Sequence, residues 1–199
     1  MKNIFIIIVV LFFLVPVSNA QSDFSNEIKV GYGTISSNRI VGFFGDILVY
    51  PGTLGTLEYD DYQLLGTLFL EYNHSFNNWF ELGGIFAYER ISKNAYSNSV
   101  ILGKETNNIY TIGVQAGFNY LDKEVVKLYS QLGLAYTFTA NSFNEELENS
   151  NVKLDKDIFH SFNFHVSAIG VRVGKQFGVS AELGFGYKGI ANIGIGYRF

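Results

Sequence analysis

Apolar and polar side chains alternate along most of this chain. The pattern is clearest at the end, where Ala191, Ile193, Ile195, Tyr197 and Phe199 share one face and the residues between them are Asn, Gly and Arg. Because successive side chains of a β-strand point to opposite faces, a period of two predicts strands. Each block extends over about 10 residues, the length that a membrane-crossing strand needs.

Eight such blocks follow one another, at residues 26–36, 62–74, 79–90, 108–120, 125–139, 159–173, 177–187 and 190–199. One face of each block is mainly apolar and aromatic, and the other carries mostly glycine and polar or charged residues. After Ala168 the alternation changes phase, which predicts a β-bulge. The pattern predicts an all-β fold, an eight-stranded antiparallel up-and-down transmembrane β-barrel.

The connections between the blocks alternate in length. Short ones are predicted at 75–78, 121–124 and 174–176 on one side, and long ones at 37–61, 91–107 and 140–157 on the other, where a fourth, at Lys188–Gly189, is short. Short periplasmic turns and long external loops are typical of outer-membrane barrels.

Aromatic residues are expected to form a girdle at each end of the blocks, where rings meet lipid headgroups. The first girdle is predicted at the short-turn end, at Phe76, Trp79, Phe80, Tyr120, Phe177 and Phe199. The second is predicted at the opposite end, at Tyr88, Tyr110, Tyr136, Phe138 and Tyr187.

The N-terminal residues do not alternate. Lys2 precedes an apolar run, Ile4–Val17, and Ser18–Ala20 has the form of a cleavage site. This pattern predicts a secretory signal peptide at 1–20 and a mature barrel domain at 21–199. A membrane-anchoring helix is the alternative, but the run is shorter than the roughly 20 apolar residues that a span requires.

Composition narrows the functional classes. The 199 residues suit one domain, and they include no cysteine, which excludes disulfides, thiolate metal sites and a cysteine nucleophile. The formal net charge of −4 argues against nucleic-acid binding, which would require clustered Lys and Arg and a basic balance. Only two prolines occur, as long strands require. No cofactor and no metal are expected.

The alternating C-terminal block that ends in Tyr197, Arg198 and Phe199 resembles the assembly signal of outer-membrane barrels. The chain from residue 26 onward is similar to the small outer-membrane β-barrel domain family of the OmpX and OmpA-barrel type. The resemblance implies the outer membrane of a Gram-negative cell, recognition of Tyr197 and Phe199 by the barrel insertion machinery, and contact with lipopolysaccharide. It leaves the activity open, because such barrels serve several functions.

The predicted inward face carries charges that must be paired there. They are Lys29, Glu71, Glu81, Glu89, Lys127, Arg172, Glu182 and Arg198. Eight strands enclose an interior that side chains just fill. We expect a filled barrel with a structural or surface-interaction role through its external loops. The first alternative is a narrow porin-like channel for small solutes.

The second alternative is a lipid A-modifying hydrolase. His165 and Ser167 share a face, and Glu182 on the next block could orient the histidine, as in a nucleophilic relay. The arrangement resembles outer-membrane lipid A deacylases of the PagL type. The resemblance is weak because the alternation turns these side chains inward, away from lipid.

Two external segments and the assembly state complete the predictions. The apolar segment 38–48 has helical spacing and is expected to cap the barrel or lie at the interface. The third long loop is acidic and expected to be solvated, through Glu145, Glu146, Glu148, Asp155 and Asp157. A monomer is expected. If the fold were different, a soluble lipocalin-like barrel would be the alternative.

Overall fold

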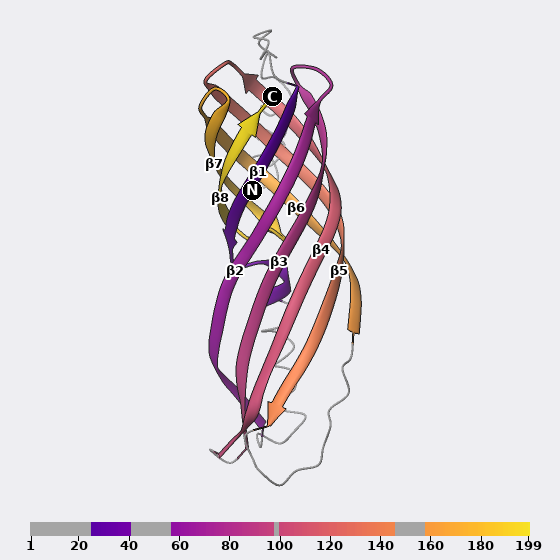
Figure 1. The fold of residues 1–199 in the computed structure, drawn as a ribbon, viewed down its shortest axis with the longest axis vertical. Helices are drawn as coiled ribbons and strands as arrows, with labels where there is room; N and C mark the ends of the chain where they lie inside the picture. Colours follow the sequence, from indigo (N-terminus) through magenta and orange to yellow (C-terminus); the bar gives the residue numbers. More distant parts are fainter. Residues whose placement is uncertain (1–24, 41–56, 98–99, 146–157) are drawn as a thin grey trace, which may run out of the picture.

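A computed structural model of the chain describes residues 25–40, 57–97, 100–145 and 158–199 (Figure 1). The predicted signal peptide lies outside these residues. The described part forms eight strands: β1 (Asn26–Thr34), β2 (Leu57–Ser75), β3 (Phe80–Ser97), β4 (Val100–Asp122), β5 (Val126–Glu145), β6 (Ile158–Val173), β7 (Phe177–Gly186) and β8 (Ala191–Arg198).

The strands form a closed antiparallel barrel in chain order. β8 pairs with β1 from Glu27 opposite Arg198 to Thr34 opposite Ala191, so the first and last strands close the wall. Closure satisfies backbone groups that an open edge would leave unpaired in lipid. The predicted fold class is confirmed. The bulge is confirmed as well, since the β6–β7 register shifts between Ser167 and Ile169.

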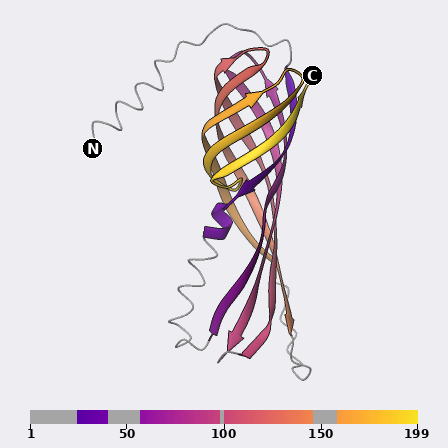
Figure 2. The same cartoon turned by 90° about the vertical axis from the view of Figure 1, so that its left-hand side faces the viewer.

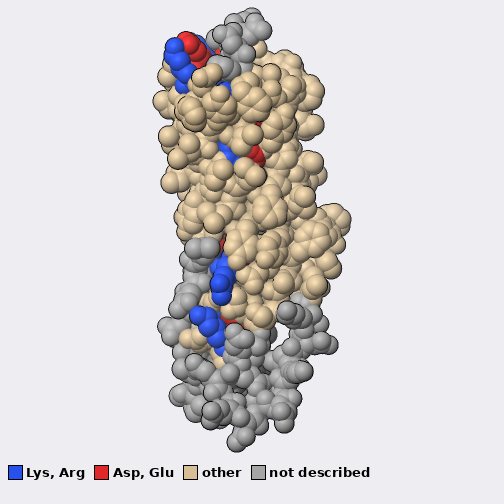
Figure 3. Space-filling model, viewed as in Figure 1, with Lys and Arg blue, Asp and Glu red and all other residues tan. Residues whose placement is uncertain are grey.

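The two faces of the wall have opposite chemistry. Large apolar side chains are exposed on the outside, as at Leu134 (70%) and Ile195 (66%), and polar side chains fill the inside. On the face seen in Figure 3, most of the surface over the middle of the barrel is uncharged, and only a few charged atoms are visible there. Lipid solvates such a surface and water does not, so the wall is that of a transmembrane barrel rather than of a soluble one. No helix in the described part is long and apolar enough to cross a membrane.

The wall is much taller on one side than on the other. β2 to β5 have 19, 18, 23 and 20 residues, whereas β1, β7 and β8 have 9, 10 and 8 (Figure 2). The prediction of a long loop at 91–107 was therefore wrong, because β3 and β4 continue through it and only residues 98–99 lie between them. The alternation was not visible there because polar residues follow one another at 92–94 and 104–107, and apolar residues follow one another at 100–102.

The aromatic residues of the two predicted girdles lie mostly on the outer face. At the short-turn end the Trp79 ring lies 5.4 Å from that of Phe80, and at the other end the rings of Tyr88 and Tyr110 are 5.3 Å apart. Tyr187 is the exception. It follows Gly186, whose φ of 138° turns the chain, and its side chain is 1% exposed inside the barrel.

Glycine lets the backbone of β1 approach the β7–β8 turn. A Cβ at Gly33 would lie 1.7 Å from the carbonyl oxygen of Lys188, whereas a Cβ at Gly84 would meet nothing closer than 3.7 Å. We predict that Gly33→Ala lowers the free energy of unfolding by about 1–3 kcal/mol, because the turn must move. Gly84→Ala should change it by less than about 1 kcal/mol. Urea unfolding of the refolded barrel in lipid vesicles measures both values, and equal effects would contradict the prediction.

Candidate functional site in the charged barrel interior

Four charges meet in the middle of the barrel and form what we call the central cluster: Lys29 on β1, Glu71 on β2, Glu182 on β7 and Lys188 in the β7–β8 turn. Lys29 Nζ lies 2.8 Å from Glu71 Oε2 and 2.5 Å from Glu182 Oε1. Lys188 Nζ lies 2.8 Å from Glu71 Oε1 and 2.7 Å from Glu182 Oε2. Each carboxylate therefore contacts both ammonium groups, and the cluster is formally neutral.

Hydrogen bonds from β5 and β6 complete the central cluster. Tyr129 Oη donates to Glu182 Oε1 at 2.8 Å, and Ser167 Oγ donates to Glu182 Oε2 at 2.7 Å. Lys188 Nζ also donates to the side-chain oxygen of Gln131 at 2.7 Å. A buried ion pair is tolerated when such bonds satisfy its remaining lone pairs and protons. The cluster thus connects five of the eight strands across the lumen.

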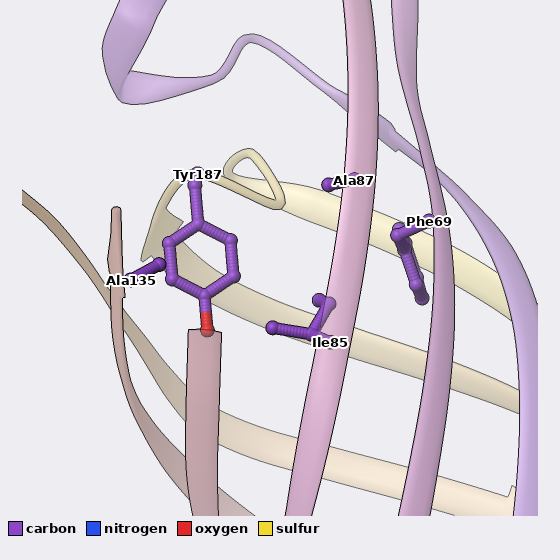
Figure 4. Packing of buried hydrophobic residues seen from close by; sticks show 5 residues of the cluster. All are labelled: Phe69, Ile85, Ala87, Ala135 and Tyr187. Atoms are coloured by element: carbon purple, nitrogen blue, oxygen red, sulfur yellow. The ribbon is translucent and has the colours of Figure 1, made fainter. Parts of the chain in front are cut away.

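An apolar group lies against the central cluster. It consists of Phe69, Ile85, Ala87, Ala135 and Tyr187. Figure 4 shows the Tyr187 ring pointing from the turn into the barrel, between β5 and β3. Lys188 Nζ lies 5.5 Å from the centroid of the Phe69 ring, within the range of a cation–π interaction. Lys188 and Tyr187 therefore fold the turn inward, where it fills the lumen.

A second set of charges occupies the short-turn end. Glu27 accepts from Arg172 at 2.7 Å and from Arg198 at 3.4 Å, and Arg198 reaches Asp122 at 3.2 Å. Arg172 also donates to the carbonyl oxygens of the β6–β7 turn, including that of Gln176 at 2.9 Å. This set joins β1 to β8, where the barrel closes.

At the same end of the barrel, Lys127 on β5 lies opposite Asp122 and Arg172 in the strand register. Its Nζ lies 2.5 Å from Glu81 Oε2 on β3. Both side chains are almost fully buried. Their pairing extends the charged filling of the lumen across another part of the wall.

A third site lies at the outer mouth, where Glu89 on β3 accepts from Arg39 Nε at 2.5 Å. Arg39 belongs to a helical turn at residues 37–40. Of the predicted apolar segment 38–48, only residues 38–40 are among the described residues.

In the acidic third loop, Glu145 is the last residue of β5. Glu146, Glu148, Asp155 and Asp157 lie outside the described residues.

The structure places all eight predicted inward charges inside the barrel, each no more than 4% exposed. It adds Glu27, Arg39, Asp122 and Lys188, which the sequence analysis did not include. Glu27 follows the same alternation as Lys29 and could have been found. Arg39 and Lys188 lie outside strands, and Asp122 follows a register shift between Asn119 and Leu121, so alternation could not assign them.

The structure brings the weak catalytic candidates His165, Ser167 and Glu182 together, but Ser167 lies between the other two, whereas a catalytic relay would have the histidine in the middle. Ser167 Oγ donates directly to Glu182 Oε2, and His165 Nε2 lies 3.0 Å from Ser167 Oγ. Since the serine proton points to the glutamate, the histidine is not placed to remove it, and the other ring nitrogen of His165 has no partner among the described residues. Ser167 is fully buried, so the acyl ester of a lipid substrate cannot reach its hydroxyl.

Tyr197 and Phe199, the predicted assembly signal, lie on the outer face at 39% and 47% exposure. The centroid of the Tyr197 ring lies 4.7 Å from that of the Phe177 ring and 6.0 Å from that of the Phe199 ring. In the described part of the chain, no group of His, Asp and Glu side chains is arranged to hold a metal ion.

No protein-family model and no curated protein matches the chain. Among solved structures, it is similar to Ail, the attachment invasion locus protein of Yersinia pestis, with 18% identity, a TM-score of 0.48, and coverage of 88% of this chain and 99% of that one. It is also similar to the N-terminal β-barrel domain of Pseudomonas aeruginosa OprF, with 15% identity, a TM-score of 0.49, and coverage of 90% and 100%. These structural neighbours are small outer-membrane barrels, and at these values the similarity does not extend to function.

Removing Lys188 should be costly, because Glu71 and Glu182 would then share Lys29 alone. We predict that Lys188→Ala lowers the free energy of unfolding by about 3–5 kcal/mol, as expected for an uncompensated buried charge. The matched control is Lys175→Ala, which breaks the exposed pair with Glu124 and should cost less than about 1 kcal/mol. Urea unfolding in vesicles compares the two, and similar values would show that the central cluster is not stabilising.

Proposed function

We propose that this chain is an outer-membrane barrel that neither conducts nor catalyses and that presents its tall wall, β2 to β5, as an external contact surface. The observation that carries the proposal is the combination of a lumen crossed by paired charges with four strands that extend beyond the others. The filled lumen argues against a solute path. The extended strands offer surface outside the membrane.

The tall wall has two unpaired edges within the described residues. β1 pairs with β2 only as far as Gly33 opposite Thr67, and the N–H of Gly66 donates to Tyr32 Oη, so β2 from Leu57 to Leu65 has no paired strand on that side. β6 pairs with β5 as far as Ala140, so β5 beyond it is paired with β4 alone. A free strand edge presents backbone donors and acceptors to which an extended polypeptide can add. This supports a polypeptide partner for the surface.

The remaining partners belong to the same proposal. The exposed apolar and aromatic side chains of the outer face support contact with outer-membrane lipid and lipopolysaccharide. The exposure of Tyr197 and Phe199 supports their recognition by the insertion machinery during biogenesis. Eight strands close without a second copy, which favours a monomer. Export depends on the predicted signal peptide at residues 1–20.

Contact through the tall wall is tested by shortening it. Lys93 and Glu105 are paired in the β3–β4 hairpin, so replacing the intervening residues with a two-residue turn keeps the register. We predict that cells displaying the full chain attach to protein-coated surfaces and that cells displaying the shortened chain at equal density do not. Counting attached cells measures the effect. Equal attachment, or none by the full chain, would remove the support for a contact surface.

The absence of conduction is tested in a planar bilayer. Refolded residues 21–199 should give no steady current steps, because the central cluster fills the lumen. Folding is checked in the same preparation by its resistance to protease. Discrete steps from the folded barrel would favour the narrow-channel alternative instead.

The lipid A hydrolase alternative predicts a different result. Expression of the chain in a Gram-negative host should leave the lipid A mass spectrum unchanged, and Ser167→Ala should give the same spectrum. If lipid A lost an acyl chain when the parent was expressed and kept it when Ser167→Ala was expressed, this would support the enzyme and contradict our proposal.

A further inference from the structure

The chain turns into the barrel mouth directly after β1. Ile35 has a φ of 52°, a conformation that β-branched residues rarely adopt, and it redirects the backbone inward. Ser36 is fully buried and Ser37 is 9% exposed. We call residues 36–39 the mouth turn. Figure 2 shows its helical part just beyond the outer ends of the short strands, on the open side of the wall.

Glu89 holds the mouth turn from one side of the barrel. Its carboxylate accepts three hydrogen bonds, from Ser36 Oγ at 2.6 Å, Asn38 Nδ2 at 3.3 Å and Arg39 Nε at 2.5 Å. The Glu89 side chain is 1% exposed. Within the described part of the chain, every hydrogen bond to this carboxylate comes from the mouth turn.

β6 holds the mouth turn from another side. Ser37 Oγ donates to Asn163 Oδ1 at 3.1 Å, and Asn163 Nδ2 donates to Asn38 Oδ1 at 2.8 Å. In the closed barrel, β3 and β6 are separated by β4 and β5 on one side and by four strands on the other. The mouth turn therefore spans the lumen rather than following the wall.

The carboxylate and the mouth turn depend on each other. A buried carboxylate that loses its donors is strongly disfavoured, so Glu89 keeps the turn in place. The strained Ile35 works in the opposite direction, because it persists only while surrounding contacts impose its conformation. The mouth turn is thus strained where it begins and is kept in place by its contacts with Glu89 and Asn163, of which only Glu89 is charged.

We propose that the mouth turn is a lid that closes the outer entrance to the barrel interior and that Glu89 is its lock. When the lock is intact, the layer beneath is sealed from the outside. That layer includes Thr111 and Thr137, which are 2% and 1% exposed and whose hydroxyls lie 3.0 Å apart. Thr111 pairs with Ala87, one inward position deeper on β3 than Glu89. Release of the lid opens this layer to solvent from the external side.

The chain contains no cysteine, so a single introduced cysteine reports on the lid. In Thr111→Cys, a membrane-impermeant maleimide added outside proteoliposomes should react slowly. Adding Glu89→Gln or Arg39→Gln should raise the labelling rate at least about tenfold, since the rate follows the population of the open state. Arg90→Gln is the matched control, because Arg90 neighbours Glu89 but is exposed on the outer face, and it should leave the rate unchanged.

Trypsin gives a second readout without an added cysteine. In the parent, Arg39 is held by Glu89 and should resist cleavage, whereas Glu89→Gln should be cut after Arg39. Because β1 stays paired with β2 and β8, the N-terminal fragment is detected by mass spectrometry after denaturation. If Glu89→Gln does not fold, Arg39→Gln with Thr111→Cys still tests the lid. Slow labelling in both folded lock variants would overturn the proposal. Fast labelling of the parent would overturn it too, because the mouth would then be open with its lock intact.

Discussion

The whole structure depends on the pairing of charges inside a barrel whose outside faces lipid. Strand alternation sends every second side chain inward, and eight strands leave room for little except those side chains. Lys29 and Lys188 therefore have to meet Glu71 and Glu182 at contact distance, between 2.5 and 2.8 Å. The apolar exterior makes this unavoidable, because a charge that left the lumen would enter hydrocarbon.

The unequal height of the wall explains how a turn residue joins this pairing. β7 and β8 are so short that their connecting turn lies at the level of the lumen rather than above it. Gly186 and Gly189, with φ of 138° and 100°, let the turn bend inward. Lys188 then supplies the second positive charge that the two glutamates need, and Tyr187 fills the space beside it. The low side of the barrel is thus closed by its own turn.

Much of this could be predicted from the sequence, and the failures have physical causes. The alternation of apolar and polar residues, with one face of each block mainly apolar, identified the eight strands and the bulge after Ala168. It also identified the inward charges from Lys29 to Arg198. It could not assign Lys188, Tyr187 or Arg39, because side chains outside strands have no fixed alternation. It also missed the outer ends of β3 and β4, because polar residues at 92–94 and 104–107 and apolar residues at 100–102 follow one another there without alternation.

The ionic contacts at the two ends of the lumen are held by different kinds of segment, and this determines which end can change its conformation. At the short-turn end, Glu27, Arg172, Arg198 and Asp122 come from strands, so their pairing is fixed by the same register that closes the barrel. In the central cluster each charge has two partners, and the loss of one contact leaves another. At the outer mouth, Glu89 is held by a single segment that enters through a strained residue. The mouth is therefore the part of the lumen that can change state without breaking a strand pair, and it lies on the side where the tall wall extends towards other molecules.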